Sequence, residues 1–324
     1  MCFLRAYIRI HTTTMSNVKV SVRVRPTANF AQDQLKIDQD TNSIYVHMSA
    51  HGDDDGDGHN SANKTDSYQF SYHNVLHNAG QDTCYESNTA KVVGGVLDGR
   101  NGTVMAYGQT GAGKTFTMIG SLGTYHQRGI QPRALAHVFR EIENRTEYEF
   151  KVSVSYMELY NERIFDLLSV DQRDQSAYSI VEDKRHGKGT HVRGLVVREC
   201  NSEKDALNCL FEGAEKRTTA QHILNTTSNR SHCIFTVYIT QRSRLASSDK
   251  VIHSKLNLVD LAGSERLKKV DREDPITGER SLDSTIRRES MYINKSLTYL
   301  EQVVVALTTK NRHHIPYRQT KLTN

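Results

Sequence analysis

The sequence predicts a layered α/β fold. Residues 108–115 read Gly-Gln-Thr-Gly-Ala-Gly-Lys-Thr and match the pattern G-x-x-x-x-G-K-T. The apolar run before them, residues 103–107, is typical of a buried strand, and residues 116–119 continue as the first turn of a helix. Further strand and helix patterns alternate along the chain, which favours a sheet covered by helices.

Hydrophobic periodicity places the other elements. Alternation with a period of two predicts strands over residues 19–26, 152–160, 234–239 and 256–261. Apolar residues at helical spacing predict helices over residues 205–217 and 292–307. There is no internal repeat and no proline-rich linker, so we expect one domain over residues 17–324.

The motif at residues 108–115 carries specific chemistry. Its glycines let backbone N–H groups close around a phosphate chain without Cβ clashes. Lys114 then reaches the outer phosphates, and Thr115 offers its hydroxyl to Mg²⁺. The alternative is a glycine-rich turn with a lysine by chance, which the agreement of strand, loop and helix start disfavours.

The amino-acid composition limits the classes of protein to which the chain can belong. The 324 residues are 37% hydrophobic and 24% charged, and no apolar run reaches the ~18 residues of a membrane-spanning helix. The net charge of +5 is too small to identify a partner without local clustering. The five cysteines form no C-x-x-C pair, which favours free thiols in a reducing compartment over a disulfide frame or a zinc site.

The N-terminal segment is expected to stand outside the domain. Arg5 and Arg9 interrupt any apolar core, which excludes a secretory signal. A short organelle presequence is one alternative. We favour an upstream extension that precedes a natural start at Met15, and we predict that residues 1–16 are disordered.

Three more segments narrow the function. In residues 256–266 an apolar strand delivers Asp260 to the sheet edge, where a carboxylate can hold Mg²⁺, and Gly263 follows where a backbone N–H can meet a terminal phosphate. Residues 225–232 supply hydroxyls and an arginine before a strand. Residues 22–26 form a basic strand that can hold the base of a nucleotide.

These motifs occur in the order found in kinesin motor domains, and the chain resembles that family from residue 17 to its end. The ordered segments are 23–26, 106–115, 225–232, 260–266 and 292–297. The resemblance implies a phosphate-loop NTPase with a central, mostly parallel sheet flanked by helices on both faces. Residues 232–236, 300–302 and 314–319 are most similar to the kinesin-9 class, which works in cilia and flagella.

The resemblance also implies roles for individual residues, with ATP and Mg²⁺ as cofactors. Arg230 and Glu265 are expected to form an ion pair that closes the site. The implied catalytic residues are Lys114, Ser228, Arg230, Gly263 and Glu265. The implied metal-binding residues are Thr115, Ser228 and Asp260. The implied nucleotide-binding residues are Arg23, Arg25, Pro26, Gly108, Gln109, Thr110, Gly111, Ala112, Gly113, Lys114, Thr115, Phe116, Asn225 and Ser231.

A basic cluster lies in and after the last predicted helix. Its members are Lys295, Lys310, Arg312, His313, His314, Arg318 and Lys321. Microtubule surfaces are acidic, so the resemblance implies microtubule contact through Lys295, Arg312, His313, His314, Arg318 and Lys321. The alternative is a solvated helix end whose cations complement the helix dipole.

The chain departs from the family pattern in several places, among them His222, where the family has a threonine. Asn229 replaces a serine, from which we expect slower turnover with nucleotide binding retained. The loop before the last helix is longer than usual, and its charged stretch around residues 272–283 is expected to be mobile and to face the track. The family continues beyond residues 321–323 with a strand inside the sheet, a final helix and the neck linker. We therefore expect an incomplete domain with unpaired strand edges.

The sequence thus predicts a microtubule-dependent ATPase motor domain. Two alternatives stay open: a non-motile microtubule-associated protein that binds nucleotide and hydrolyses it weakly, and a phosphate-loop NTPase with another partner, such as actin. We expect neither nucleic acid nor direct membrane contact. A full-length protein is expected to be a homodimer through a coiled coil outside this sequence, located on cytoplasmic or ciliary microtubules.

Overall fold

A computed structural model provides the fold of this chain. It describes residues 2–9, 17–27, 30–32, 34–49, 65–121, 123–170, 178–183, 189–223, 230–245, 250–265, 281–309, 312 and 314–324.

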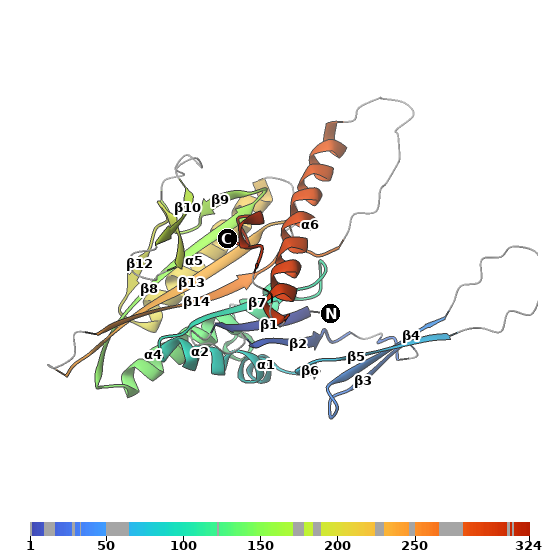
Figure 1. The fold of residues 1–324 in the computed structure, drawn as a ribbon, viewed down its shortest axis with the longest axis horizontal. Helices are drawn as coiled ribbons and strands as arrows, with labels where there is room; N and C mark the ends of the chain where they lie inside the picture. Colours follow the sequence, from blue (N-terminus) through green and yellow to red (C-terminus); the bar gives the residue numbers. More distant parts are fainter. Residues whose placement is uncertain are drawn as a thin grey trace, which may run out of the picture.

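A mixed sheet forms the centre of the molecule (Figure 1). Along the sheet lie β12 (Arg198–Cys200), β8 (Tyr148–Tyr160), β13 (His232–Ser243), β14 (Val251–Asp260), β7 (Asn101–Tyr107), β1 (Cys2–Arg9), β2 (Asn17–Val24) and β6 (Asn74–His77), and β9 (Arg163–Asp166) pairs with β8. The described parallel pairs are β14 with β7 and β2 with β6. The prediction of a mostly parallel sheet is therefore wrong, because sequential strands such as β13 and β14 pair directly as antiparallel neighbours without a crossover.

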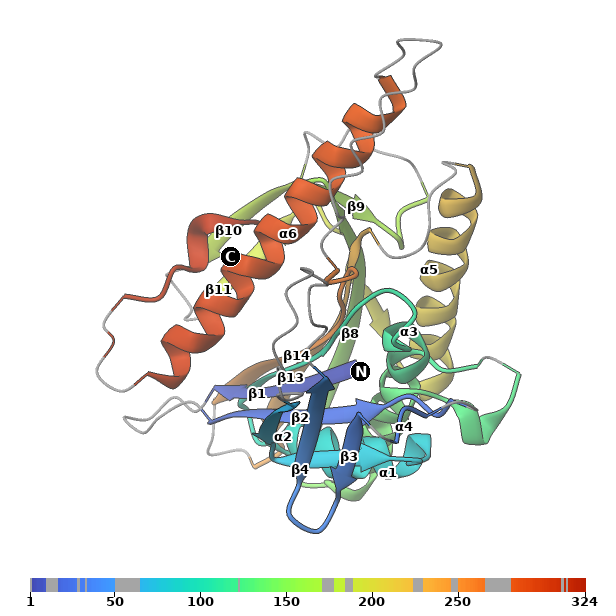
Figure 2. The same ribbon diagram turned by 90° about the vertical axis from the view of Figure 1, so that its right-hand side faces the viewer.

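Helices cover both faces of the sheet, as predicted. One face carries α1 (Gln81–Asn88), α2 (Ala90–Leu97), α3 (Lys114–Met118), α4 (Ile130–Asn144) and α5 (Glu203–Ile223), and the other carries α6 (Ser281–Thr308). Figure 2 shows α5 and α6 on opposite sides of β8.

The alternation of side chains along β7 explains this division. Val104 and Ala106 are fully buried in the large core cluster formed with the first group of helices. Met105 points to the other face, where it packs in a cluster with Leu297 and Leu300 of α6. Because successive side chains of a strand point to opposite faces, both surfaces of β7 are apolar and both are covered.

The N-terminal segment does not match its predicted disorder. Cys2–Arg9 forms β1, which lies inside the central sheet between β2 and β7 and is antiparallel to both. Residues 1 and 10–16 lie outside the described residues. The expected unpaired edges inside the sheet are likewise absent among the described strands, because β1 supplies a hydrogen-bonding neighbour to each side.

Two small sheets complete the fold. The first consists of β3 (Leu35–Asp38), β4 (Ser43–Ser49) and β5 (Thr65–Ser71), and it projects from the main body near β6 (Figure 1). The second pairs β10 (Ser179–Asp183) with β11 (Gly189–Arg193). Short 3₁₀ turns occur at η1 (Tyr125–Gln127) and η3 (Tyr317–Gln319).

The predicted strands and helices are otherwise confirmed, and most begin earlier than periodicity gave, whereas β2 ends at Val24, before the predicted end at residue 26. The predicted helix over residues 292–307 begins earlier, at Ser281. The loop predicted around residues 272–283 therefore ends by residue 280, and its remainder lies outside the described residues. Within the described residues, no helix has the length and apolar character needed to cross a membrane.

Candidate functional site: a nucleotide pocket

The predicted phosphate loop connects the end of β7 to the start of α3. Gly111 and Gly113 adopt φ angles of +77° and +89°, in the left-handed region that glycine enters without a Cβ penalty. Two glycines at these positions let the backbone turn tightly between strand and helix. The loop thus has the geometry for which its glycines were predicted.

Lys114 lies at the base of this loop and is 5% exposed. Its Nζ donates to the carbonyl oxygens of Gly108 and Gln109 at 2.9 and 3.0 Å. These bonds hold the ammonium group at the loop, where it can interact with a phosphate. The lysine is therefore positioned for the role that the sequence assigned to it.

The predicted metal ligands Thr115 and Asp260 are in direct contact. The Thr115 hydroxyl donates to Oδ2 of Asp260 at 2.7 Å, although 145 residues separate them. The same Oδ2 accepts a 2.7 Å bond from Nη1 of Arg217, and both side chains of this ion pair are almost completely buried. The arginine fixes the orientation of the carboxylate toward the phosphate loop.

The other oxygen of Asp260 supports a cation site. Oδ1 is buried and has no hydrogen-bond partner in the described part of the structure. Buried carboxylate oxygens are normally satisfied, and Mg²⁺ prefers carboxylate, hydroxyl and water oxygens as ligands. The Thr115 hydroxyl and the Asp260 carboxylate therefore fit a bound Mg²⁺ ion.

The segment after β14 is attached to the phosphate loop at two points. The Ser264 N–H donates to the Gly108 carbonyl at 3.1 Å, and the Thr110 N–H donates to Oε2 of Glu265 at 2.7 Å. The Thr110 hydroxyl bonds to the other carboxylate oxygen. Burial opposes ionisation of Glu265, but the bonds from Thr110 and the charge of Lys114 outweigh it and lower the pKa of this carboxyl.

Gly263 lies next to the contact between Glu265 and Thr110. A Cβ built on it would lie 2.4 Å from Oε2 of Glu265 and 2.5 Å from the Thr110 hydroxyl. A side chain here would displace the Glu265 carboxylate or the Thr110 hydroxyl, so glycine leaves the space in which these two groups meet.

The predicted base-binding residues meet on the outer side of the loop. Arg23 donates through Nη1 to Gln81 at 2.8 Å and to Thr117 at 3.0 Å, and its guanidinium lies 5.7 Å from the centre of the Phe116 ring. The Phe116 ring is 44% exposed and Arg25 bonds to the Gly111 carbonyl. An exposed aromatic ring beside a fixed arginine offers a stacking surface for a planar base.

A cavity of about 840 Å³ joins these parts. It is lined by Arg23, Arg25, Pro26, Ala79, Gly80, Gln81, Thr110, Gly111, Ala112, Gly113, Lys114, Thr115, Phe116, Thr117, His126 and Gln127. The volume lies within the usual range of small-molecule sites. The predicted base-binding residues and residues 110–115 of the phosphate loop thus line one cavity, whereas Gly108, Gln109 and Ser231 are not part of its lining.

Some predicted site residues have no described contact with the nucleotide pocket. Asn225, Ser228 and Asn229 lie outside the described residues. Ser231 is buried, whereas Arg230 is partly exposed. The described contacts of Glu265 go to Thr110, so an ion pair between Arg230 and Glu265 stays a prediction.

Arg217 and Gln81 were missed by the sequence analysis. Arg217 had a detectable signal, because it continues the buried stripe of α5 formed by Ala206 and Leu210. A charged residue at an apolar helical position indicates a buried partner. Gln81 gave no such signal. It receives a bond from Arg23 and donates to the Phe116 carbonyl at 2.7 Å, and both contacts join segments far apart in the sequence.

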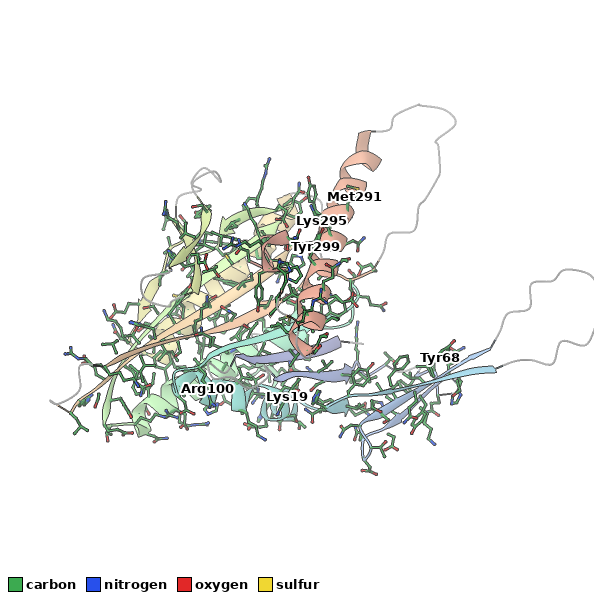
Figure 3. The ribbon with its side chains drawn as sticks, in the orientation of Figure 1. Lys19, Tyr68, Arg100, Met291, Lys295 and Tyr299 are labelled. Carbon is green, nitrogen blue, oxygen red and sulfur yellow. The ribbon has the colours of Figure 1, made fainter. Side chains whose placement is uncertain are left out.

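The predicted basic cluster lies on and after α6. Figure 3 shows Met291, Lys295 and Tyr299 along this helix, with Met291 69% exposed. Arg312, His314 and Arg318 are exposed, whereas Lys310 and His313 lie outside the described residues. Arg318 forms an exposed 3.0 Å ion pair with Glu182, and the Lys321 side chain is partly buried.

His232, which begins β13, gives a pH prediction. Burial, together with the charges of Arg217 and Lys114, lowers the pKa of this histidine to about 3. Below its ordinary pKa of 6.5 the unfolded chain binds a proton that the folded chain excludes, so stability falls as pH decreases from 6.5 toward 3. The histidine contributes up to about 1.4 kcal/mol per pH unit in this window.

Urea unfolding between pH 7 and 5 will test this prediction. A His232→Asn variant should lose less stability over this interval than the wild type, since all carboxylates are the same in both proteins. Equal losses in the two proteins would contradict a neutral buried His232.

Comparisons with known proteins agree with this geometry. A family model described as the kinesin motor domain matches residues 23–324. The solved structure of a fast kinesin, described for its implications for ATPase mechanism and interactions with microtubules, is similar with a TM-score of 0.73 at 32% identity. That similarity covers 94% of this chain and 78% of the other.

Curated relatives point to a class within that family. Kinesin-like protein KIF9 of Mus musculus is 45% identical over 96% of this chain and 38% of its own length. Kinesin-like protein KLP1 of Chlamydomonas reinhardtii is 42% identical over 94% of this chain and 37% of its own length. The chain thus spans less than two fifths of these relatives. Since the family model covers nearly all of it, the chain belongs to the kinesin motor domain family, and its similarity to KIF9 supports the kinesin-9 class.

Proposed function

We propose that this chain hydrolyses ATP in a microtubule-dependent manner, with Mg²⁺ as cofactor, and that hydrolysis drives movement along microtubules. One observation carries the proposal: Lys114 and Thr115 of the phosphate loop line the 840 Å³ cavity, and Thr115 bonds to the Asp260 carboxylate. The loop glycines and Lys114 bind the phosphate chain, while Arg23 and Phe116 form the surface for the base.

The proposed reaction requires little covalent chemistry from the protein. Phosphoryl transfer to water is accelerated mainly by positioning and by stabilising charge on the transferred group. Lys114 supplies a fixed positive charge in a buried site. Thr115 and Asp260 would hold Mg²⁺, which neutralises negative charge on the phosphates when it is bound. The Gly263 N–H would interact with the terminal phosphate, and the residue has no side chain beside Thr110 of the phosphate loop.

We also propose that α6 and the segment after it contact the microtubule. The exposed face of α6 presents Lys295, and Arg312, His314 and Arg318 follow it. Positive charge on one surface steers binding to an acidic filament and makes that binding sensitive to salt. Arg230, Ser228 and Asn225 remain proposed participants in nucleotide binding and hydrolysis. The resemblance to the kinesin-9 class supports a location on ciliary or cytoplasmic microtubules.

ATP turnover with and without microtubules tests this function. We expect microtubules to stimulate phosphate release by the wild type. The microtubule-stimulated rate of a Glu265→Ala variant should be at least about 10²-fold lower than that of the wild type. The reason is that the variant lacks the carboxylate that bonds to Thr110. A fluorescent ATP analogue should still bind to it. Retained turnover without any response to microtubules would contradict the proposed partner, and no turnover in the wild type would contradict the proposed reaction.

A further inference from the structure

His232 contacts the segment after β14 with one ring nitrogen and α6 with the other. The Ala262 N–H lies 3.1 Å from Nδ1, and the Ser296 Oγ lies 2.8 Å from Nε2. All three residues are at most 3% exposed. The imidazole is therefore sealed from solvent between the segment that adjoins Gly263 and the helix that carries Lys295.

The hydrogen bonds allow one assignment of protons. The Ser296 hydroxyl donates to the Ile293 carbonyl of its own helix at 2.8 Å. It must therefore accept from His232, which places the ring proton on Nε2. Nδ1 is then free to accept from the Ala262 N–H. In the row formed by Ala262, His232 and Ser296, every hydrogen-bond donor has one acceptor. The row is therefore fully satisfied, and its hydrogen bonds have one fixed donor-to-acceptor direction.

The same short segment also contacts the phosphate loop. Two residues before Ala262, Asp260 accepts from Thr115, and further along Ser264 and Glu265 bond to Gly108 and Thr110. A shift of this segment caused by a change at the phosphates must therefore stretch the bond to His232 or move Ser296. Buried hydrogen-bonded groups resist separation, since a donor or acceptor left without a partner here has no water to replace it.

We propose that the row Ala262–His232–Ser296 couples the nucleotide pocket to α6, with His232 as a positioning residue. The inference rests on the proposed function, in which α6 contacts the microtubule. His232 stays neutral because burial keeps its pKa far below neutrality, so the coupling is mechanical and involves no proton transfer. Coupling between two sites of this kind typically changes affinity by about 5–150-fold.

The main test compares microtubule affinity in two nucleotide states. For the wild type, the ratio of microtubule Kd with ADP to Kd with a non-hydrolysable ATP analogue defines the coupling. A Ser296→Ala variant should lower this ratio by at least about fivefold. Its affinity for a fluorescent ATP analogue should stay within about twofold of the wild type, since Ser296 lies outside the pocket lining.

Thr308→Ala is a matched control on the same helix. The Thr308 hydroxyl also bonds to carbonyls of its own helix, those of Val304 and Val305, at 3.2 and 3.0 Å. Thr308 is exposed, and it lies far along α6 from Ser296, the residue that contacts His232. Its removal should leave the Kd ratio unchanged. A His232→Asn variant and the double variant complete the set, and the double variant should lose no more coupling than the larger single loss.

Hydrogen–deuterium exchange separates this proposal from the proposed function. On binding the ATP analogue, α6 peptides that contain Ser296 should exchange more slowly in the wild type. In Ser296→Ala this slowing should be lost while phosphate-loop peptides remain protected. This readout needs no microtubules, so a failure of microtubule binding contradicts the proposed partner alone. A folded Ser296→Ala protein with unchanged nucleotide-dependent protection of α6 would overturn the coupling role.

Discussion

A Lys114→Met variant is expected to lose ATP turnover by at least about 10²–10³-fold. Its ammonium group is buried and held by the Gly108 and Gln109 carbonyls, so its charge is fixed before a phosphate arrives. A preorganised charge in a buried site contributes more to the transition state than a mobile one, and loss of one such group typically costs this much. Methionine keeps a similar length and apolar stem but removes the charge.

Steady-state phosphate release at saturating ATP will measure the effect. Lys151→Met is the matched control, because Lys151 is well exposed and pairs with Glu199 on β12. We expect the control to keep the wild-type rate within about twofold, since exposed ion pairs contribute little. Turnover by Lys114→Met within fivefold of the wild type would show that the phosphate loop is not the catalytic site.

Removal of residues 1–14, so that the chain starts at Met15, is expected to destabilise the protein strongly. Cys2–Arg9 pairs over seven residues with β2 on one side and with β7 on the other. Without β1 both strands expose backbone donors and acceptors in the middle of the sheet. We expect the unfolding temperature to fall by at least about 10 °C, which corresponds to several kcal/mol for a domain of this size.

Thermal unfolding followed by circular dichroism will test this prediction. A synthetic peptide of residues 1–14 added in trans should restore part of the lost stability, because an extended peptide can add a strand to an open sheet edge. An Arg5→Pro substitution in the full chain is a second test, since proline removes a ladder bond from a central strand. An unchanged unfolding temperature in both variants would show that β1 is dispensable.

The local patterns predicted most of the site. The glycines and lysine of residues 108–115, and the apolar strand that ends at Asp260, are short-range signals whose structural meaning is set by backbone sterics and by burial. These parts are confirmed in position: β7 and α3 flank the loop, and Thr115 touches Asp260. Arg23, Pro26 and Phe116 also line the pocket, as expected from their type and place in the chain.

Other features could not be predicted from local patterns. Strand direction depends on which segments become neighbours, and local patterns do not show this. A mostly parallel sheet was expected, and the sheet is mixed. Arg217 has its partner Asp260 43 residues away, and Gln81 has its partner Arg23 58 residues away. Pairings of this kind are fixed by the packing of α5 and α1 against the sheet.

By itself the sequence determined the family of this protein and its candidate site: a phosphate loop, a carboxylate proposed to hold Mg²⁺, and an ordered set of motifs typical of kinesin motor domains. These depend on residue type and short spacing. Only the tertiary structure decided that Cys2–Arg9 is an internal strand, that Arg217 orients Asp260, and that His232 joins Ala262 to Ser296. The physical reason is that buried polar groups require partners, and those partners are chosen by how distant segments pack together.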